Sequence, residues 1–294
     1  MKLDQVTIPI EPRFLGESID LAAALYRKDF RQVLGLTMLF AGPALLLGWL
    51  LNFLAGMGLL TNLVIFYFLS PLLGAVLVAG EGPRVFGEQF TARGALSRFS
   101  SHATRLILYL WVSRTVLLGV GLLLYAIEPL LLFVFCPAAL FLSRDSTLIR
   151  EVILLEQPKG TSLHRRINAL RRGGPPAVSG QMFETQLFFS CVVVILFILI
   201  DLTLGFVLGM PVLLGRLPVE DITRLPVEDI GLVLPYLLGS DPWVIFVLMA
   251  TMWIVYPLAR LTLFLCYIDI RIREECWDLE LDFRVEARRL EGVS

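Results

Sequence analysis

The chain has 294 residues, of which 57% are hydrophobic and 17% charged, and its mean hydropathy is +0.78. Soluble domains contain roughly 45 to 50% apolar residues, so this composition excludes an ordinary soluble protein and favours an integral membrane protein. The formal net charge of −1 does not indicate a nucleic-acid partner. The cysteines have no metal-ligand spacing and do not form a disulfide framework; they are Cys136, Cys191, Cys266 and Cys276.

Residues 1–32 form an N-terminal segment with its own pattern. From residue 14 to residue 31, apolar residues recur at roughly a helical period among charged residues, and the stretch ends in Arg27, Lys28 and Arg31. This pattern predicts an amphipathic helix that lies on the cytoplasmic face of a membrane. No apolar segment typical of a cleaved signal peptide precedes it, so we expect the first span to direct insertion.

No charged residue occurs between Arg31 and Glu81, a run long enough to cross a bilayer twice at about 20 residues per crossing. The whole chain predicts an all-α membrane protein with a six-helix domain over residues 33–268. Residues 106–143 would make one helix of about 57 Å at 1.5 Å per residue, and Glu128 with Pro129 divides it into a hairpin. The predicted spans are about 33–54, 60–80, 105–125, 129–143, 186–209 and 243–268.

The basic residues test this number of spans, because Lys and Arg concentrate in short cytoplasmic loops. Six spans place both termini on one side, together with the loops before span three and after span four. The loop after span four is the most basic, with Arg144, Arg150, Lys159, Arg165, Arg166, Arg171 and Arg172. The opposite side carries only Arg216 and Arg224. The pattern therefore indicates a cytoplasmic-membrane protein with both termini in the cytoplasm.

Three ionisable residues fall inside predicted spans: Arg114, Asp201 and Arg260. Such groups should face the protein interior and find a partner. Asp201 shares a helix face with Gly205 and Gly209, a small-residue face that favours helix packing. The three residues could form a polar pocket or ion path between spans three, five and six. Alternatively, they form a structural ion pair, or an arginine snorkels to the interface.

Two further cytoplasmic helices are expected. One is a basic helix over about residues 163–172, and the other continues span six into residues 269–294. Residues 279–287 also alternate as a strand would, but a lone strand after a membrane helix leaves backbone groups unpaired, so a helix is favoured. These segments provide a basic cytoplasmic face, which consists of Arg165, Arg166, Arg171, Arg172, Arg271 and Arg273.

Three segments together resemble the membrane domain of glycerophosphoryl diester phosphodiesterases. They are residues 15–30, which include LGESID and ALYRKDF; residues 151–173, which include EVILLE and LRRG; and residues 267–278, which read YIDIRIREECWD. Cys276 departs from this pattern, because the family usually has glycine there. The resemblance implies a six-span protein without the catalytic domain that names the family.

The sequence contains no catalytic constellation, because its only histidines, His102 and His164, lie among arginines and no HExxH motif or glycine-rich phosphate loop occurs. We therefore expect a non-enzymatic protein without a cofactor or metal. The basic face predicts a scaffold or accessory subunit that binds membrane lipid, and possible protein partners, at the cytoplasmic surface. The alternative is a transporter or lipid-handling protein that uses the Arg114, Asp201 and Arg260 cluster. The sequence does not indicate an oligomeric state.

Overall fold

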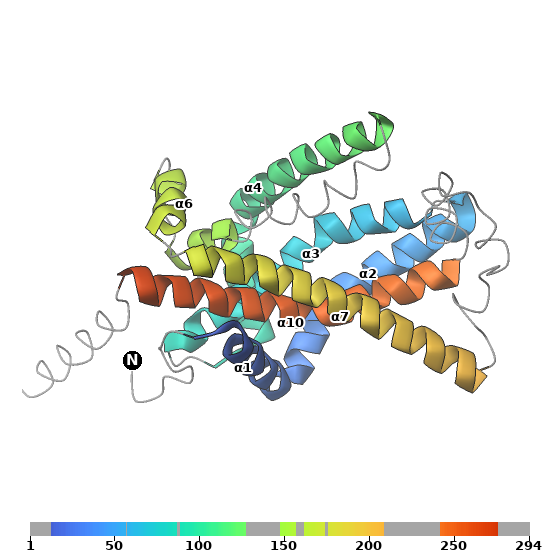
Figure 1. The fold of residues 1–294 in the computed structure, drawn as a ribbon, viewed down its shortest axis with the longest axis horizontal. Helices are drawn as coiled ribbons and strands as arrows, with labels where there is room; N and C mark the ends of the chain where they lie inside the picture. The colour runs from blue at the N-terminus through green and yellow to red at the C-terminus, as the bar shows by residue number, and fades with distance from the viewer. Residues whose placement is uncertain are drawn as a thin grey trace, which may run out of the picture.

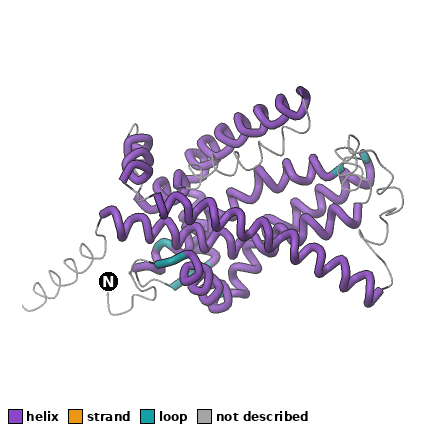
Figure 2. Tube along the Cα trace, in the orientation of Figure 1, coloured by secondary structure: helices purple, strands orange, loops and turns teal. Residues whose placement is uncertain are grey.

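Every regular element in the described part of the chain is a helix (Figure 2). The structure is a computed structural model that describes residues 13–56, 58–86, 89–127, 148–156, 162–173, 176–208 and 242–275. The long helices are α2 (Phe30–Ala55), α3 (Leu59–Glu81), α4 (Ala92–Ile127), α7 (Pro176–Leu208) and α10 (Pro242–Glu275). The short ones are α1 (Leu15–Lys28), the 3₁₀ helix η2 (Pro83–Phe86), the π-helix η3 (Val152–Glu156) and α6 (Ser162–Gly173).

The five long helices are each long and apolar enough to cross a membrane. They coincide with five of the six predicted spans, the first, second, third, fifth and sixth. The predicted fourth span, residues 129–143, lies outside the described residues. The all-helical architecture is thus confirmed, together with five helices that could each cross a membrane.

Local sequence explains where the first two long helices separate. α2 ends at Gly56, whose φ of 62° lies in the left-handed region that glycine adopts without a Cβ penalty. α2, α3 and α10 continue through Pro43, Pro71 and Pro257. Each proline removes one backbone hydrogen bond, a loss that neighbouring helices make tolerable in membrane proteins.

Helix α10 is the centre of the fold and contacts α1, α2, α3, α6 and α7. Figure 1 shows α10 lying alongside α7, with α1 and α6 near its C-terminal end. We call this end of the molecule the α6 end. Residues 260–270 of α10 are all buried, so packing surrounds the helix on every side there. The largest apolar core also lies at the α6 end, and it includes Leu25, Ile153, Leu163, Met182 and Phe264.

The other parts of the long helices expose apolar side chains. Leu54 is 70% exposed, Leu123 60% and Phe206 92%, and similar residues cover α2, α4 and α7. A soluble protein rarely leaves an apolar surface of this extent uncovered. The exposed surface therefore suits contact with lipid, whereas the α6 end has an interior like that of a soluble protein.

Helices occur where the sequence analysis expected short ones. α1 covers most of residues 14–31, and its buried residues are Ser18, Ala22 and Leu25. α6 covers the predicted basic helix at 163–172. α10 carries the sixth span seven residues past Ile268, to Glu275. Residues 276–294, including the ambiguous stretch 279–287, lie outside the described residues.

Candidate functional site

Arg260 is the most deeply buried cation of the described structure, with 1% of its surface exposed. Its Nη2 forms an ion pair with the Oε1 atom of Glu151, which is fully buried. Glu151 is the residue directly before η3, in the segment that follows the predicted fourth span. Apart from this ion pair, the three side-chain nitrogens of Arg260 and both carboxylate oxygens of Glu151 have no hydrogen-bond partner among the described residues.

Glycine at position 74 lets a second arginine reach α3 beside Arg260. A Cβ atom at Gly74 would lie 2.6 Å from the Tyr256 hydroxyl, 2.8 Å from Nη1 of Arg150 and 3.0 Å from Cδ of Arg260. Any larger side chain at this position would collide with these groups. Arg150 is 4% exposed, and its Nη1 donates a hydrogen bond of 3.2 Å to the Tyr256 hydroxyl. Three helical segments therefore meet at Gly74.

Arg114 of α4 is the third arginine of this region. It donates a hydrogen bond to the backbone carbonyl of Tyr67 and lies over the Tyr67 ring, with its guanidinium carbon 4.4 Å from the ring centroid. The ring face attracts a cation, which lowers the cost of holding the charge away from water. The positive charges of Arg114 and Arg150 are close enough to act unfavourably on Arg260.

We call Arg114, Arg150, Arg260 and Glu151 the arginine cluster. Among the described residues, the cluster contains three cations and one carboxylate. Glu151 pairs with Arg260, whereas Arg150 and Arg114 donate their hydrogen bonds to neutral oxygens. An unbalanced buried charge is expensive, and functional ligands often supply the missing balance. Chemically, the arrangement suits the binding of an anion.

Asp201 lies at a different level of the bundle from Arg260. The hydroxyl of Thr185 in α7 lies 3.8 Å from Sγ of Cys266 in α10, which sets the register of these antiparallel helices. Sixteen residues further along α7, Asp201 is level with about residue 250 of α10, about 15 Å from Arg260 at 1.5 Å per residue. Asp201 is buried, as its predicted inward orientation requires, and it has interactions of its own.

The structure thus brings Arg114 and Arg260 together, but the carboxylate beside Arg260 is Glu151 rather than Asp201. Gly205 is half-buried on α7, and Gly209 lies outside the described residues. The sequence predicts a cytoplasmic loop at Arg150 and Glu151, whereas the structure buries both residues. One feature of the sequence could have indicated their burial: they directly precede residues 152–155, an apolar stretch typical of a buried segment.

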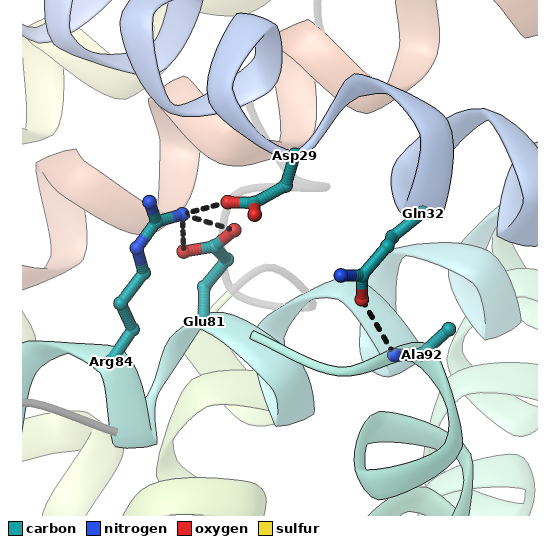
Figure 3. Close-up of polar contacts among 5 residues, drawn as sticks. All are labelled: Asp29, Gln32, Glu81, Arg84 and Ala92. Carbon is teal, nitrogen blue, oxygen red and sulfur yellow. Dashed lines mark hydrogen bonds and ion pairs between the residues drawn. The ribbon is translucent and has the colours of Figure 1, made fainter. Parts of the chain in front are cut away.

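A second group of charges fastens the turn between α1 and α2 to the end of α3. Figure 3 shows Asp29 and Glu81 both directed at Nη1 of Arg84. Both Glu81 oxygens lie 3.3 Å from this atom, and Arg84 also pairs with Asp29. Nearby, the side chain of Gln32 accepts a 3.1 Å hydrogen bond from the backbone N–H of Ala92, the first residue of α4.

Glu156, at the end of η3, joins α6 to α10. It forms an ion pair with Arg166 of α6 and accepts a 2.7 Å hydrogen bond from the Tyr267 hydroxyl. Nε of Arg271 lies 3.8 Å from the same carboxylate. A single carboxylate therefore holds three side chains from two helices.

The N-terminal segment is tied to α10 by Asp269. Its Oδ1 accepts a 2.9 Å hydrogen bond from the backbone N–H of Arg13, and its Oδ2 lies 2.9 Å from Nε of Arg273. Arg273 also donates to the carbonyl of Arg13, at 3.0 Å. The chain just before α1 is consequently fixed to the last turns of α10.

The predicted basic face is partly used inside the chain. Arg166, Arg271 and Arg273 take part in the contacts above, while Arg165 is exposed. The side chains of Arg171 and Arg172 lie outside the described part of the structure. Among the described residues, no group of three or more His, Cys, Asp or Glu side chains could hold a metal ion.

No family model matches this chain, and neither a curated protein nor a solved structure is significantly similar to it.

Proposed function

We propose that the chain is a six-span protein of the cytoplasmic membrane with both termini in the cytoplasm, related to the membrane domain of glycerophosphoryl diester phosphodiesterases. The distribution of Lys and Arg supports this orientation, since the α6 end carries the basic loops. The segments that carry the resemblance also support it. Residues 15–30, 151–173 and the described part of 267–278 pack around one another at the α6 end.

The function that the geometry supports best is a non-enzymatic scaffold or accessory subunit, which organises anionic lipid or a protein partner at the cytoplasmic surface. The observation that carries it is the helical layer at the α6 end. α1 and α6 lie against α10, and polar contacts of Glu156 and Asp269 fix this layer to α10. Because α6 is fixed in this way, the exposed Arg165 is held in a defined position from which it can bind lipid headgroups. Each basic residue near an anionic surface contributes about 1 kcal/mol of attraction.

Lipid retention tests this function. The purified chain is analysed by native mass spectrometry after extraction from vesicles of equal phosphatidylglycerol and phosphatidylethanolamine. We expect enrichment of phosphatidylglycerol, and the triple variant Arg165→Gln, Arg171→Gln, Arg172→Gln should lose most of it. The matched variant with lysine at all three positions keeps the charge and should keep the enrichment. Equal retention of both lipids by the unaltered chain contradicts the proposal.

A second candidate is a transporter or lipid-handling protein. The observation that favours it is the arginine cluster, where buried cations outnumber the carboxylate. Asp201, at another depth of α7, would then contribute a separate polar step along a path through the helices. A flux assay in proteoliposomes distinguishes the two functions, since a scaffold without transport activity moves no anion.

A further inference from the structure

The arginine cluster has the features of a binding site rather than of a closed ion pair. Arg260 and Arg150 are 1% and 4% exposed, and their Nε atoms, together with Nη1 and Nη2 of Arg260, have no hydrogen-bond partner among the described residues. Nε of Arg114 likewise has no hydrogen-bond partner among the described residues. Both oxygens of Glu151 also lack a hydrogen-bond partner, but two oxygens are too few for the unpaired donors of three arginines. Buried polar atoms are nearly always hydrogen-bonded in native proteins, so this excess of donors points to an absent acceptor.

The charges define the acceptor. Three guanidinium groups and one carboxylate leave two positive charges, and the hydrogen bonds from Arg150 and Arg114 go to a phenol and a backbone carbonyl. A carboxylate ligand would supply one negative charge and two oxygens. A phosphate monoester or inorganic phosphate supplies up to two negative charges and three or more oxygens, which guanidinium forks bind in pairs.

We propose that Arg114, Arg150 and Arg260 form a binding site for a phosphate group, either the headgroup of a lipid phosphate monoester or free inorganic phosphate. Glu151 holds Arg260 in place as a positioning residue, and Gly74 leaves space for the Arg150 guanidinium at the α3 backbone. Phosphate oxygens would replace the repulsion between the guanidinium groups with charge-assisted hydrogen bonds. The phosphate site does not depend on which of the two proposed functions is correct, because a scaffold and a transporter can both bind phosphate.

The test uses the full chain purified in dodecyl maltoside, an uncharged detergent, with unfolding followed by intrinsic tryptophan fluorescence. A ligand that binds the folded state raises Tm in a saturable manner. We expect this rise with sodium phosphate or with dioctanoyl phosphatidic acid, and not with sodium chloride at equal ionic strength or with dioctanoyl phosphatidylcholine. A response to inorganic phosphate identifies the free anion as sufficient, whereas a response to phosphatidic acid alone identifies the lipid. No saturable response to either overturns the proposal.

Two variants locate the site. Arg150→Gln should weaken phosphate binding about 10-fold or more, because a hydrogen bond to a charged group is lost. Arg93→Gln is the matched control, since it removes the same charge from an exposed position outside the basic face and should leave binding unchanged. Gly74→Ala keeps every charge but displaces the Arg150 guanidinium, and should also weaken binding. Unaltered binding in both Arg150→Gln and Gly74→Ala, or equal loss in Arg93→Gln, places phosphate elsewhere and overturns the proposal. A failure of the lipid-retention test at Arg165, Arg171 and Arg172 does not affect this result.

Discussion

Arg260 and Glu151 form an ion pair in which each charge compensates the other, because both side chains are buried away from water. Taking two charges out of water is expensive, so such a pair adds little net stability over apolar residues of similar volume. Removing one partner is a different matter, since the remaining charge is then buried without compensation. The guanidinium of Arg260 is already opposed by Arg114 and Arg150, which makes its dependence on Glu151 greater.

We therefore predict that Glu151→Gln lowers the free energy of unfolding by about 3 to 5 kcal/mol. Glu184→Gln, on the exposed surface of α7, is the control and should change it by less than about 0.5 kcal/mol. The measurement is denaturant unfolding of the purified protein in detergent micelles.

The double variant Glu151→Gln, Arg260→Met should be less destabilised than the sum of its single variants, because no charge is then left unpaired. Additive effects, within about 0.5 kcal/mol, are expected only of residues that do not interact, and would contradict the pair.

At the scale of elements, the α6 end is assembled by carboxylates that each hold groups from more than one segment. Glu156 joins η3, α6 and α10, and Asp269 joins α10 to the chain before α1. These contacts lie beside the largest apolar core. The carboxylates thereby define the register in which α1 and α6 pack against α10, while apolar burial supplies most of the stability.

For α6, we predict that Glu156→Gln increases amide hydrogen exchange in Ser162–Gly173 by about 10-fold. Two ion pairs and part of one hydrogen bond are lost, and about 1.4 kcal/mol of local opening free energy corresponds to that factor. Exchange in α2 should stay unchanged. An equal increase in both helices would indicate global destabilisation instead of a loosened α6.

For α1, Asp269→Asn should release the chain at Arg13, because a neutral amide holds the Arg273 guanidinium less strongly than a carboxylate does. We expect faster hydrogen exchange in Leu15–Lys28 while the exchange of α6 is unaffected. Asp20→Asn, on the exposed face of α1, serves as the control. If Asp269→Asn leaves α1 as protected as before, this attachment does not hold the helix.

These elements also show what sequence reasoning could and could not predict. The run without charge before Glu81 suffices to place α2 and α3, because this signal is local. The helical period also predicted α1 and α6. The pair of Glu151 with Arg260 could not be predicted, since residues 109 positions apart share no local pattern. Asp201 was the more obvious partner because it lies within a span, whereas Glu151 lies in a segment that only the tertiary fold buries.

At the scale of the whole molecule, the two ends of the helix bundle have opposite characters. The α6 end has a dense interior, ion pairs and basic residues, while the long helices elsewhere expose apolar side chains. A membrane protein needs this division, because lipid covers the apolar surface and water solvates the charged layer. The asymmetry of Lys and Arg predicts that the α6 end faces the cytoplasm.

Cysteine labelling tests this orientation in intact cells. In a background where the four native cysteines are replaced by alanine, a single cysteine placed between Pro218 and Gly231 should react with a membrane-impermeant maleimide. A cysteine in place of Lys159 should react only after the cells are permeabilised, because Lys159 belongs to the most basic loop. Without the predicted fourth span, the loop around Lys159 would lie on the opposite side of the membrane from the N-terminus, so a third single cysteine, in place of Lys2, decides the number of spans. Protection of both the Lys2 and Lys159 positions supports six spans, whereas external labelling at either one contradicts the topology.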